Sequence, residues 1–459
     1  MQPTTRVGVI GTGHFATAVL TQSGSIADLQ IAAVADLNPE AARHAFRLAG
    51  VAEDALEFCE SRAAALAALE RGQRVIVEDA LLLMELPLDV IVESTGVPEA
   101  GAVHARAAIA AGKHVAMVTK ETDSVVGPML AHLARQAGVS YTAVDGDQHG
   151  LLIELVRWCR GLGLEVLAAG KARDGDYFYD RTALEVNSGE FVLQLRSRDS
   201  RWLAPLRPLN LAGLLQERMD FLAPLPGVGG WDLTEPVIAA NALDLRPDDP
   251  FDGTGGGQPH GPALYTTEIP GVFCPWSMGG ILENRGVIDI VTSLRIPEAA
   301  GLGGGVFAVV HAHSDYSRQI LATKGCLTNP AGDAALLYRP YHLCGVETPV
   351  TLLAAAQRGH SAYDSSYWQA WDVVMVARRD LAAGETLGTD HSPDVEALMA
   401  PVQSIHNDAA WLPIHLGSGH RLRVDVPEGA PVPVGAVERP SNSVLWALRA
   451  EQEKLLGIG

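Results

Sequence analysis

The chain has 459 residues, and 47% of them are hydrophobic, which is typical of a globular protein with two or three domains. Its 34 Lys and Arg residues face 54 Asp and Glu residues, so the formal net charge of −20 argues against nucleic acid and anionic membranes as partners. No apolar run in the sequence approaches the roughly 20 residues that cross a bilayer.

Cysteine usage and the first residues indicate where the protein works. The five cysteines are scattered and include no Cys-x-x-Cys pair, which favours a reduced chain without a structural zinc. The N-terminus enters an apolar run directly, which leaves no room for a signal peptide. We therefore expect a cytoplasmic protein that acts on a small-molecule substrate, and we expect it to form a homo-oligomer.

The first motif is a glycine-rich turn behind an apolar run. Residues 7–10 are apolar or small, as in a buried parallel strand, and a Gly-x-Gly-x-x-Ala pattern follows. The first glycine permits the tight turn, the second admits a pyrophosphate, and the small third residue lets the helix pack closely. The helix behind the turn would direct its N–H groups and its positive dipole end at the phosphates. The predicted cofactor-binding residues here are Gly11, Thr12, Gly13, His14, Phe15 and Ala16.

A second apolar run, residues 31–35, ends in Asp36. This acid lies about 20 residues beyond the glycine motif, where a dinucleotide-binding fold places the carboxylate that binds the adenosine ribose. Because a carboxylate repels a 2′-phosphate, Asp36 favours NAD, with NADP as the alternative. The competing interpretation is an ordinary strand-to-helix turn, and the position of Asp36 argues against it.

Strands and helices alternate as far as about residue 150. Helices are predicted at 39–48, 61–71, 98–111 and 128–136. Buried strands are predicted at 88–93, 114–118 and 139–144. The alternation predicts an α/β fold with a Rossmann-type doubly wound parallel sheet over residues 1–150, in which the strands end beside the cofactor.

Polar residues at the ends of two predicted strands are further candidates. Ser94, Thr95 and Gly96 follow the strand at 88–93, and we expect them beside the nicotinamide ribose, although they also read as a helix cap. Lys120 follows the strand at 114–118, where a fixed cation can contact the cofactor and stabilise an alkoxide that develops during hydride transfer. A lysine is ordinarily a solvated surface charge, and we interpret Lys113 in that way.

Carboxylates and one imidazole follow the last strand of this region. Asp147 and His149 lie in the turn, and Glu154 lies in the next helix. They suit a polar substrate, with Asp147 in a catalytic role, but capping of the helix by Asp147 explains the turn equally well. Because no second cluster of ligands is evident, the sequence predicts no metal site.

The sequence changes character after residue 151. Strand-like runs at 165–169, 190–196 and 287–294 are separated by Gly- and Pro-rich loops, notably 247–261, which predicts a mixed α+β substrate domain over 151–368. From residue 369 to 459, short strands with frequent turns predict a small β domain that ends in an amphipathic helix at 441–456.

Four residues of the substrate domain are candidates for chemistry. Lys171 ends the first strand-like run, and we expect it to face Lys120 across a cleft as a proton donor and acceptor. His260 lies in a rigid Pro-His-Gly-Pro turn. Arg339 and His342 lie in a Tyr-Arg-Pro-Tyr-His run, where Arg339 suits a substrate carboxylate or phosphate. Simple turn packing is the alternative explanation for both stretches.

These motifs resemble a known family. The glycine-rich start, the Glu-x-Thr-Gly run at 93–96 and the Gly-Lys-His-Val-x-x-x-x-Lys run at 112–120 are similar to homoserine dehydrogenase, which has a lysine at the position of Lys120. Over most of its length the chain is more similar to homoserine-dehydrogenase-like proteins with a C-terminal SAF domain, which include 1-deoxy-D-xylulose 5-phosphate reductoisomerase-like enzymes. The similar parts are 89–127, 162–171, 279–290 and 339–343, and the run 374–385 resembles the opening of a SAF domain, as in sialic acid synthase.

The resemblance implies an NAD(P)-dependent oxidoreductase that transfers a hydride to or from a small polar alcohol or carbonyl compound. One alternative is reductoisomerisation of a phosphorylated ketose, in which a divalent metal usually holds the substrate. The reductoisomerase-like members lack a lysine at the position of Lys120 and carry Gly-Asp-Glu-Pro where this chain has residues 146–149. A second alternative, from another class, is a non-catalytic nucleotide-binding sensor.

Overall fold

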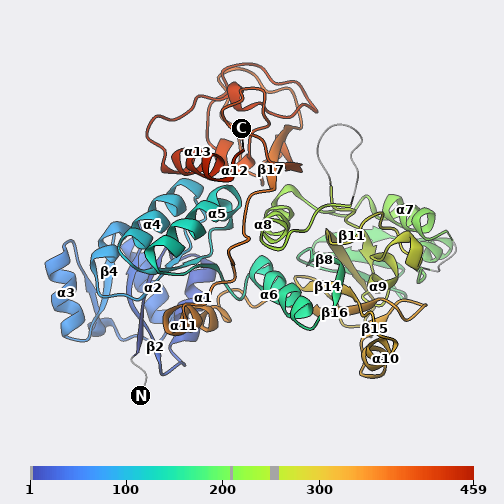
Figure 1. Cartoon of the computed structure of the whole chain (residues 1–459), viewed down its shortest axis with the longest axis horizontal. Helices are drawn as coiled ribbons and strands as arrows, with labels where there is room; N and C mark the ends of the chain where they lie inside the picture. Colours follow the sequence, from blue (N-terminus) through green and yellow to red (C-terminus); the bar gives the residue numbers. More distant parts are fainter. Residues whose placement is uncertain (1–3, 207–209, 249–257, 459) are drawn as a thin grey trace. The chain divides into compact units, whose positions relative to one another are not determined.

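The computed structural model describes residues 4–206, 210–248 and 258–458, and the chain divides into two compact units (Figure 1). Unit 1 combines residues up to 150 with 343–396 and 402 onward, and unit 2 comprises 151–342 and 397–401. Most of the C-terminal segment that we expected to form a separate domain is thus part of unit 1. Residues 249–257 of the predicted loop at 247–261 lie outside the described residues.

Unit 1 is built on a parallel sheet of seven strands in the order β3-β4-β2-β1-β5-β6-β7. The strands are β1 (Thr5–Ile10), β2 (Leu29–Ala35), β3 (Leu56–Phe58), β4 (Arg74–Val77), β5 (Val90–Glu93), β6 (His114–Met117) and β7 (Tyr141–Ala143). The chain starts at β1 in the middle of the sheet and winds outward first on one side and then on the other. The expected Rossmann-like parallel sheet is confirmed.

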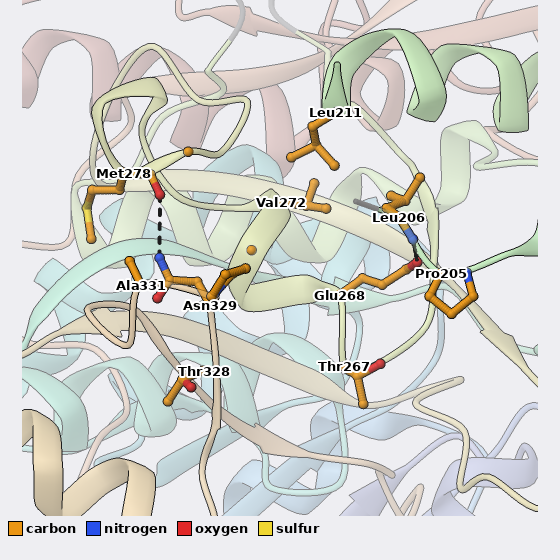
Figure 2. Close-up of a pocket in the computed structure, with 13 residues that line it drawn as sticks. Pro205, Leu206, Leu211, Thr267, Glu268, Val272, Met278, Thr328, Asn329 and Ala331 are labelled. Carbon is orange, nitrogen blue, oxygen red and sulfur yellow. Dashed lines mark hydrogen bonds between the residues drawn. The ribbon is translucent and has the colours of Figure 1, made fainter. Parts of the chain in front are cut away.

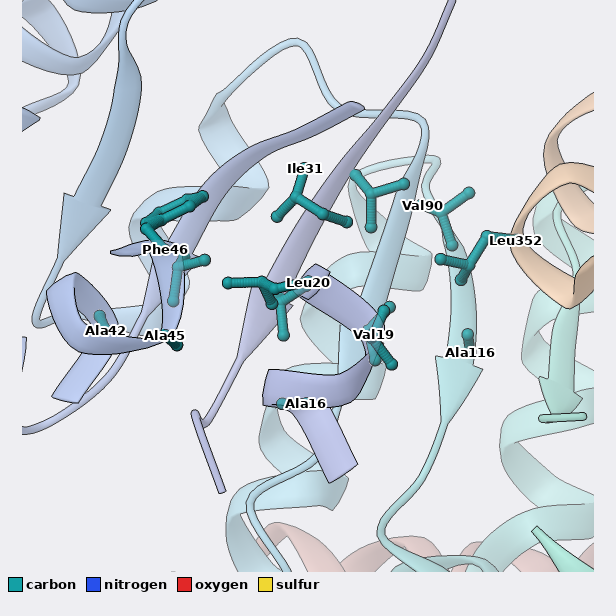
Figure 3. Packing of buried hydrophobic residues seen from close by; sticks show 14 of the residues in the cluster. Ala16, Val19, Leu20, Ile31, Ala42, Ala45, Phe46, Val90, Ala116 and Leu352 are labelled. Atoms are coloured by element: carbon teal, nitrogen blue, oxygen red, sulfur yellow. The ribbon is translucent and has the colours of Figure 1, made fainter. Parts of the chain in front are cut away.

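Helices cover this sheet, and the core lies between the two layers. The helices are α1 (His14–Ser23), α2 (Pro39–Leu48), α3 (Arg62–Glu70), α4 (Pro98–Ala110), α5 (Lys120–Ala137) and α11 (Thr348–Arg358). Figure 3 shows Leu20 of α1, Ile31 of β2 and Phe46 of α2 packed together, with Leu352 of α11 at the other side of the cluster. Burial of one such side chain contributes about 1.5–3 kcal/mol, so α11 belongs to this core although it lies more than 200 residues downstream.

Helix α5 is longer than expected because Pro128 does not begin it. The helix starts at Lys120 and continues through Pro128, although proline cannot donate to the carbonyl four residues earlier. That carbonyl, on Ser124, accepts a hydrogen bond of 2.8 Å from the side-chain amide of Gln369 instead. A side chain from a distant part of the chain therefore satisfies the group that the proline leaves open.

The C-terminal segment contributes a two-stranded sheet of β17 (Trp371–Ala377) and β18 (Val395–Pro401), together with α12 (Ile414–Gly417) and α13 (Val444–Leu456), and residues 397–401 of β18 are counted with unit 2. Elsewhere in this segment, Arg421 and Leu422 form isolated β-bridges with Thr386 and Val437. Figure 1 shows α13 over α4 and α5. The carboxylate of Glu99 on α4 accepts the N–H of Val444 at 2.7 Å, which caps α13.

Unit 2 contains a mixed sheet of nine strands, eight of them in the order β11-β10-β9-β13-β8-β14-β16-β15, with β12 paired to β13. The strands are β8 (Glu165–Ala172), β9 (Tyr177–Asp180), β10 (Glu185–Ser188), β11 (Phe191–Gln194), β12 (Ala263–Leu264), β13 (Val287–Arg295), β14 (Val306–His311), β15 (Leu327–Thr328) and β16 (Ala335–Arg339). The α-helices are α6 (Gln148–Gly161), which enters from unit 1, α7 (Leu211–Leu222), α8 (Thr234–Leu243), α9 (Ile269–Val272) and α10 (Asp315–Thr323).

Short 3₁₀-helices complete the described elements, at Glu53–Ala55, Ala80–Glu85, Ser197–Leu203, Gly230–Asp232, Trp276–Met278 and Val434–Ala436. Among all the helices that the structure describes, none combines the length and the apolar character that a membrane crossing requires.

Candidate functional site

The glycine-rich turn between β1 and α1 has the geometry of a phosphate-binding turn. Gly11 has a φ of +83°, and a Cβ there would lie 2.9 Å from the carbonyl oxygen of Ser94 at the end of β5. A Cβ at Gly13 would meet no described atom within 4 Å, so the N-terminus of α1 opens into free space. Ala16 is buried against the sheet. Gly11 therefore permits the tight turn, Gly13 leaves space for a phosphate to approach the backbone, and Ala16 lets α1 pack closely on the sheet, as the motif requires.

The Asp36 carboxylate lies beside this turn and accepts hydrogen bonds from it. Its Oδ2 accepts the backbone N–H of Thr12 at 2.8 Å and the Thr12 hydroxyl at 2.5 Å, and its Oδ1 accepts the backbone N–H of Asn38 at 2.8 Å. A carboxylate offers about four acceptor positions, so capacity remains for the hydroxyls of a ligand. The sequence placed Asp36 at the end of β2, and the structure adds Thr12 as the residue that orients it.

The residues after β5 are held by internal hydrogen bonds. The hydroxyl of Ser94 donates to the carbonyl oxygen of Ile10 at 2.7 Å, and the Thr95 hydroxyl donates to the buried carboxylate of Glu93 at 2.7 Å. Gly96 is exposed, and its N–H donates to the hydroxyl of Thr119 at 3.0 Å. These residues line the same edge as the glycine turn, and their direct contact with a cofactor stays a prediction.

Lys120 is the first residue of α5, directly behind the end of β6. Its neighbour Glu121 is half-buried, and desolvation raises the pKa of Glu121 to about 7, helped by the charges of Asp390 and Asp147 and opposed by that of Lys120. The structure therefore gathers one ammonium and three carboxylates near the start of α5. We missed Glu121 and Asp390 in the sequence: Glu121 adjoins Lys120 but looks like a first-turn helix acid, and Asp390 comes from a distant segment.

A second carboxylate lies two residues further along α5. Asp123 is fully buried, and Tyr141 and Tyr367 donate to its Oδ1 at 3.0 and 3.3 Å, while Tyr363 donates to its Oδ2. Burial raises the pKa of Asp123, and nearby His149, 4.0 Å away, and the tyrosines oppose that shift. The predicted substrate ligand His149 is thus buried beside Asp123.

Asp147 is the residue directly before α6, which is the position that the proposed capping role requires. Its Oδ1 accepts the N–H of Gln148, the first residue of α6, at 2.8 Å, and the same oxygen lies 3.5 Å from Nδ1 of His149. A catalytic role for Asp147 stays a prediction.

Lys113 is not a surface residue, and our interpretation of it was wrong. It is only 6% exposed, and its Nζ donates to the carbonyl oxygens of Leu86 and Leu88 at 2.7 and 3.1 Å. Burial lowers the pKa of Lys113. The side chain fastens the loop before β5 and has no exposed charge to offer a substrate.

In unit 2, Lys171 and Arg339 lie at one edge of the sheet. Lys171 on β8 pairs with Val306 on β14, and Val306 pairs with Arg339 on β16. Residues in register on neighbouring strands point to the same face, so both basic side chains leave the same face of the sheet. The guanidinium of Arg339 lies 5.2 Å from the centre of the Tyr341 ring.

Two acids that we did not predict surround the Lys171 ammonium. Its Nζ lies 2.9 Å from Oε2 of Glu235, in the first turn of α8, and 3.1 Å from Oδ1 of Asp232, just before that helix. All three side chains are buried. In the sequence, both acids come just before the uncharged residues 236–243. Their spacing of three residues, which would place them on one side of a helix, was the one local feature that could have suggested that they act together.

His260 forms a second pair in unit 2. Its Nδ1 lies 2.6 Å from Oδ2 of the fully buried Asp289 on β13, and its Nε2 lies 3.9 Å from Asp248. A carboxylate on Nδ1 sets the tautomer and the orientation of an imidazole. Of the other predicted residues, His342 has its Nδ1 2.6 Å from the carbonyl oxygen of Gly304, and Glu154 is half-buried on α6.

A cavity of about 350 Å³ in unit 2 lies away from these groups (Figure 2). It is mostly apolar, with Leu206, Leu211, Val272 and Met278 in its wall. Its one carboxylate, Glu268, is paired with Arg218 at 2.7 Å. None of the residues that we predicted to bind a substrate lines it, so the cavity gives no support to those predictions.

Comparison with known proteins identifies the class of the protein. Residues 229–348 match the family model described as "Oxidoreductase DRL, catalytic domain". That segment contains Asp232, Glu235, His260, Asp289 and Arg339. The match confirms our expectation of an oxidoreductase. It covers about a quarter of the chain and is not specific to homoserine dehydrogenase, so that resemblance and the SAF domain stay predictions. No curated protein sequence matches the chain.

Several solved oxidoreductases align with parts of the chain at low similarity. An NAD binding oxidoreductase from Klebsiella pneumoniae is 19% identical, with a TM-score of 0.27, over 38% of this chain and 43% of that one. Scyllo-inositol dehydrogenase from Lactobacillus casei, solved with NAD(H) and scyllo-inositol, is 14% identical, with a TM-score of 0.28, over 38% of this chain and 46% of that one. The chain thus spans less than half the length of these structures.

Proposed function

We propose that this chain is an NAD-dependent oxidoreductase that transfers a hydride between the nicotinamide and a small polar alcohol or carbonyl compound. The observation that carries the proposal is the open space at Gly13, at the N-terminus of α1, with the Asp36 carboxylate beside the same turn. A pyrophosphate would be held by the N–H groups of that turn, where the helix dipole favours negative charge. When bound, the dinucleotide supplies or accepts the hydride.

Asp36 supports NAD as the cofactor. Its carboxylate is already oriented by Thr12 and Asn38. It would accept hydrogen bonds from the adenosine ribose hydroxyls, and it would repel the additional phosphate of NADP. We therefore propose that Thr12 acts with Asp36 in the choice of cofactor.

The chain offers two sets of groups for the substrate. Lys120 would place a cation where negative charge develops on a carbonyl oxygen, and Ser94, Thr95 and Gly96 would shape the same edge. In unit 2, the pair of His260 and Asp289 has the arrangement of a general acid–base, with the carboxylate holding the imidazole, and Arg339 would bind an anionic substrate group. Lys171, between Asp232 and Glu235, would exchange a proton with the substrate oxygen.

The resemblance adds finer elements to the proposal. We propose that the chain is homoserine-dehydrogenase-like in its hydride-transfer unit, and that the segment opening at residues 374–385 is SAF-like. The strand β17 ends at Ala377, inside that run, and polar residues and a glycine turn follow it.

Titration with NADH and NADPH tests the cofactor site. Binding is followed by the fluorescence of the reduced nicotinamide for the wild type, for Asp36→Ala and for the control Asp54→Ala, which changes an exposed acid in the same unit. We expect tighter binding of NADH by the wild type, a loss of that preference in Asp36→Ala, and no change in Asp54→Ala. Tighter binding of NADPH by the wild type would overturn the role of Asp36.

A second candidate function is reductoisomerisation of a phosphorylated ketose. The observation that favours it is the pair of buried carboxylates, Asp232 and Glu235, which lie beside one amine and in the same unit as Arg339, a candidate phosphate ligand. A panel of hydroxy acids, aldehydes and sugar phosphates, assayed by NADH absorbance with and without Mg²⁺ or Mn²⁺, separates the two functions. Turnover of a phosphorylated ketose alone, and only with metal, would favour this candidate, whereas NADH binding without any turnover would favour the sensor.

A further inference from the structure

The edge of the unit 2 sheet opposite Lys171 carries two histidines and a glutamate. Glu165 is the first residue of β8, and its partner in the antiparallel pairing with β14 is His311. His313 follows two residues later, and the two imidazole rings lie 5.2 Å apart at an interplanar angle of 80°. One potential ligand atom from each of the three side chains lies within 4.8 Å of the other two. We propose that Glu165, His311 and His313 bind a divalent transition-metal ion such as Zn²⁺.

The hydrogen bond of His311 prepares its ring for a metal. Its Nδ1 lies 2.7 Å from the backbone carbonyl oxygen of Asp333, which can only accept a hydrogen bond. The proton is therefore on Nδ1, and the lone pair is on Nε2. Metal-bound histidines commonly have this arrangement, in which a carbonyl or carboxylate orients the ring through the other nitrogen. The hydrogen bond is formed within the protein before any ion arrives.

Glu165 is also oriented while one oxygen remains available. Its Oε2 accepts a hydrogen bond of 2.5 Å from Arg285, and this leaves Oε1 for a ligand. The Glu165 side chain is 31% exposed, and His313 is exposed at the end of the strand, so an ion can reach the group from solvent.

The ligand types select the metal. Two imidazoles and one carboxylate suit Zn²⁺ and its neighbours in the first transition row, whereas Mg²⁺ and Ca²⁺ prefer oxygen ligands alone. Tetrahedral bonding brings neighbouring ligand atoms to about 3.3–3.5 Å, so the three side chains must approach one another by up to about 1.5 Å. His313 can supply this movement because it lies beyond the last residue of β14. A water molecule would complete the coordination.

The site is independent of the proposed hydride-transfer function. Along β14, His311 is at one end and Val306, which pairs with Lys171, is at the other. A bound ion would join the start of β8 to the end of β14 and stabilise unit 2 by binding the folded state.

Calorimetric titration of the metal-stripped full chain with ZnCl₂, and separately with MgCl₂, tests the proposal at pH 7.5. The variants are His313→Ala, which changes an exposed side chain, and Glu165→Gln. The control is His406→Ala, an exposed histidine in unit 1. We expect one Zn²⁺ site in the wild type and in the control, binding weakened by at least about 10- to 100-fold in both site variants, and no Mg²⁺ binding at this site.

Two further readouts sharpen the test. Zn²⁺ should raise the thermal unfolding midpoint of unit 2 in the wild type and in His406→Ala but not in His313→Ala. Binding should weaken at pH 5.5, because protonated imidazoles do not bind metal. Equal Zn²⁺ affinity and stoichiometry in the wild type and in His313→Ala would overturn the proposal, as would a loss of equal size in His406→Ala.

Discussion

Ionisation of Glu121 should make unit 1 less stable as the pH rises through neutrality. Burial raises the pKa of this carboxyl from 4.5 to about 7 in the folded protein. A carboxyl with a raised pKa binds its proton more tightly in the folded state than in the unfolded state. Its contribution to stability is therefore fully present below about pH 4.5 and is lost as the pH rises toward and through 7.

The magnitude follows from the shift. One pKa unit corresponds to 1.36 kcal/mol, so a change from 4.5 to about 7 corresponds to about 3 kcal/mol of unfolding free energy between acid and alkaline pH. Glu121→Gln preserves the shape of the side chain and cannot ionise. We expect its stability to be close to that of the wild type at pH 4.5 and higher by up to about 3 kcal/mol at pH 8.

Urea unfolding followed by far-ultraviolet circular dichroism, at half-unit steps from pH 4.5 to 8, measures this difference. Glu70→Gln, an exposed acid on α3, is the matched control and should follow the wild type at every pH. Other buried groups such as Asp123 also titrate, but they contribute equally to both proteins and cancel in the difference. A difference between Glu121→Gln and the wild type that does not vary with pH would refute the reasoning.

Three other substitutions separate chemistry from structure. Lys120→Met should bind NADH within a few-fold of the wild type and lower turnover by at least about 10²-fold, because a cation near the developing oxyanion acts mainly on the rate; near-normal turnover would refute its role. Lys171→Met should also lower turnover in the same steady-state assay, and an unchanged rate would remove it from the proposed site. Lys113→Met leaves two buried carbonyl groups without their donor, so we expect the unfolding free energy to fall by about 1–3 kcal/mol in urea, and normal stability would contradict this.

The Rossmann-like half of unit 1 could be predicted because its signals are local. The helix α2 begins at Pro39 behind Asn38, whose side chain accepts the N–H of Glu40, and it ends at Leu48 as expected. The glycine turn and Asp36 could be located for the same reason, because each directly follows one apolar strand in the sequence. Helix α5 shows the limit of local reasoning, because Pro128 usually marks a helix start and only the amide of Gln369 lets the helix pass through it.

The residues proposed for the candidate site came from local patterns alone. Lys120 and Lys171 were proposed because each follows or ends a predicted strand, and Arg339 because it lies in a Tyr-Arg-Pro-Tyr-His run. Their partners could not be found, because Asp232 and Glu235 meet Lys171 only after α8 packs on the sheet. A charged residue in a helix is usually solvated, so a sequence gives no reason to expect such acids in the interior.

The C-terminal segment also depends on contacts that only the folded chain makes. Arg449 on α13 reads as a surface residue of an amphipathic helix, yet it is fully buried and bound to Asp372 at 2.6 Å and Glu453 at 2.8 Å. The next turn of α13 reaches α5, where the amide oxygen of Gln452 accepts the N–H of Met129 at 2.9 Å. Buried ion pairs add little net stability, but they tolerate few alternative arrangements. Arg449 therefore fixes α13 against β17 through Asp372, and its hydrogen bond of 3.3 Å to the carbonyl oxygen of Val125 fixes α13 against α5, the helix that begins at Lys120.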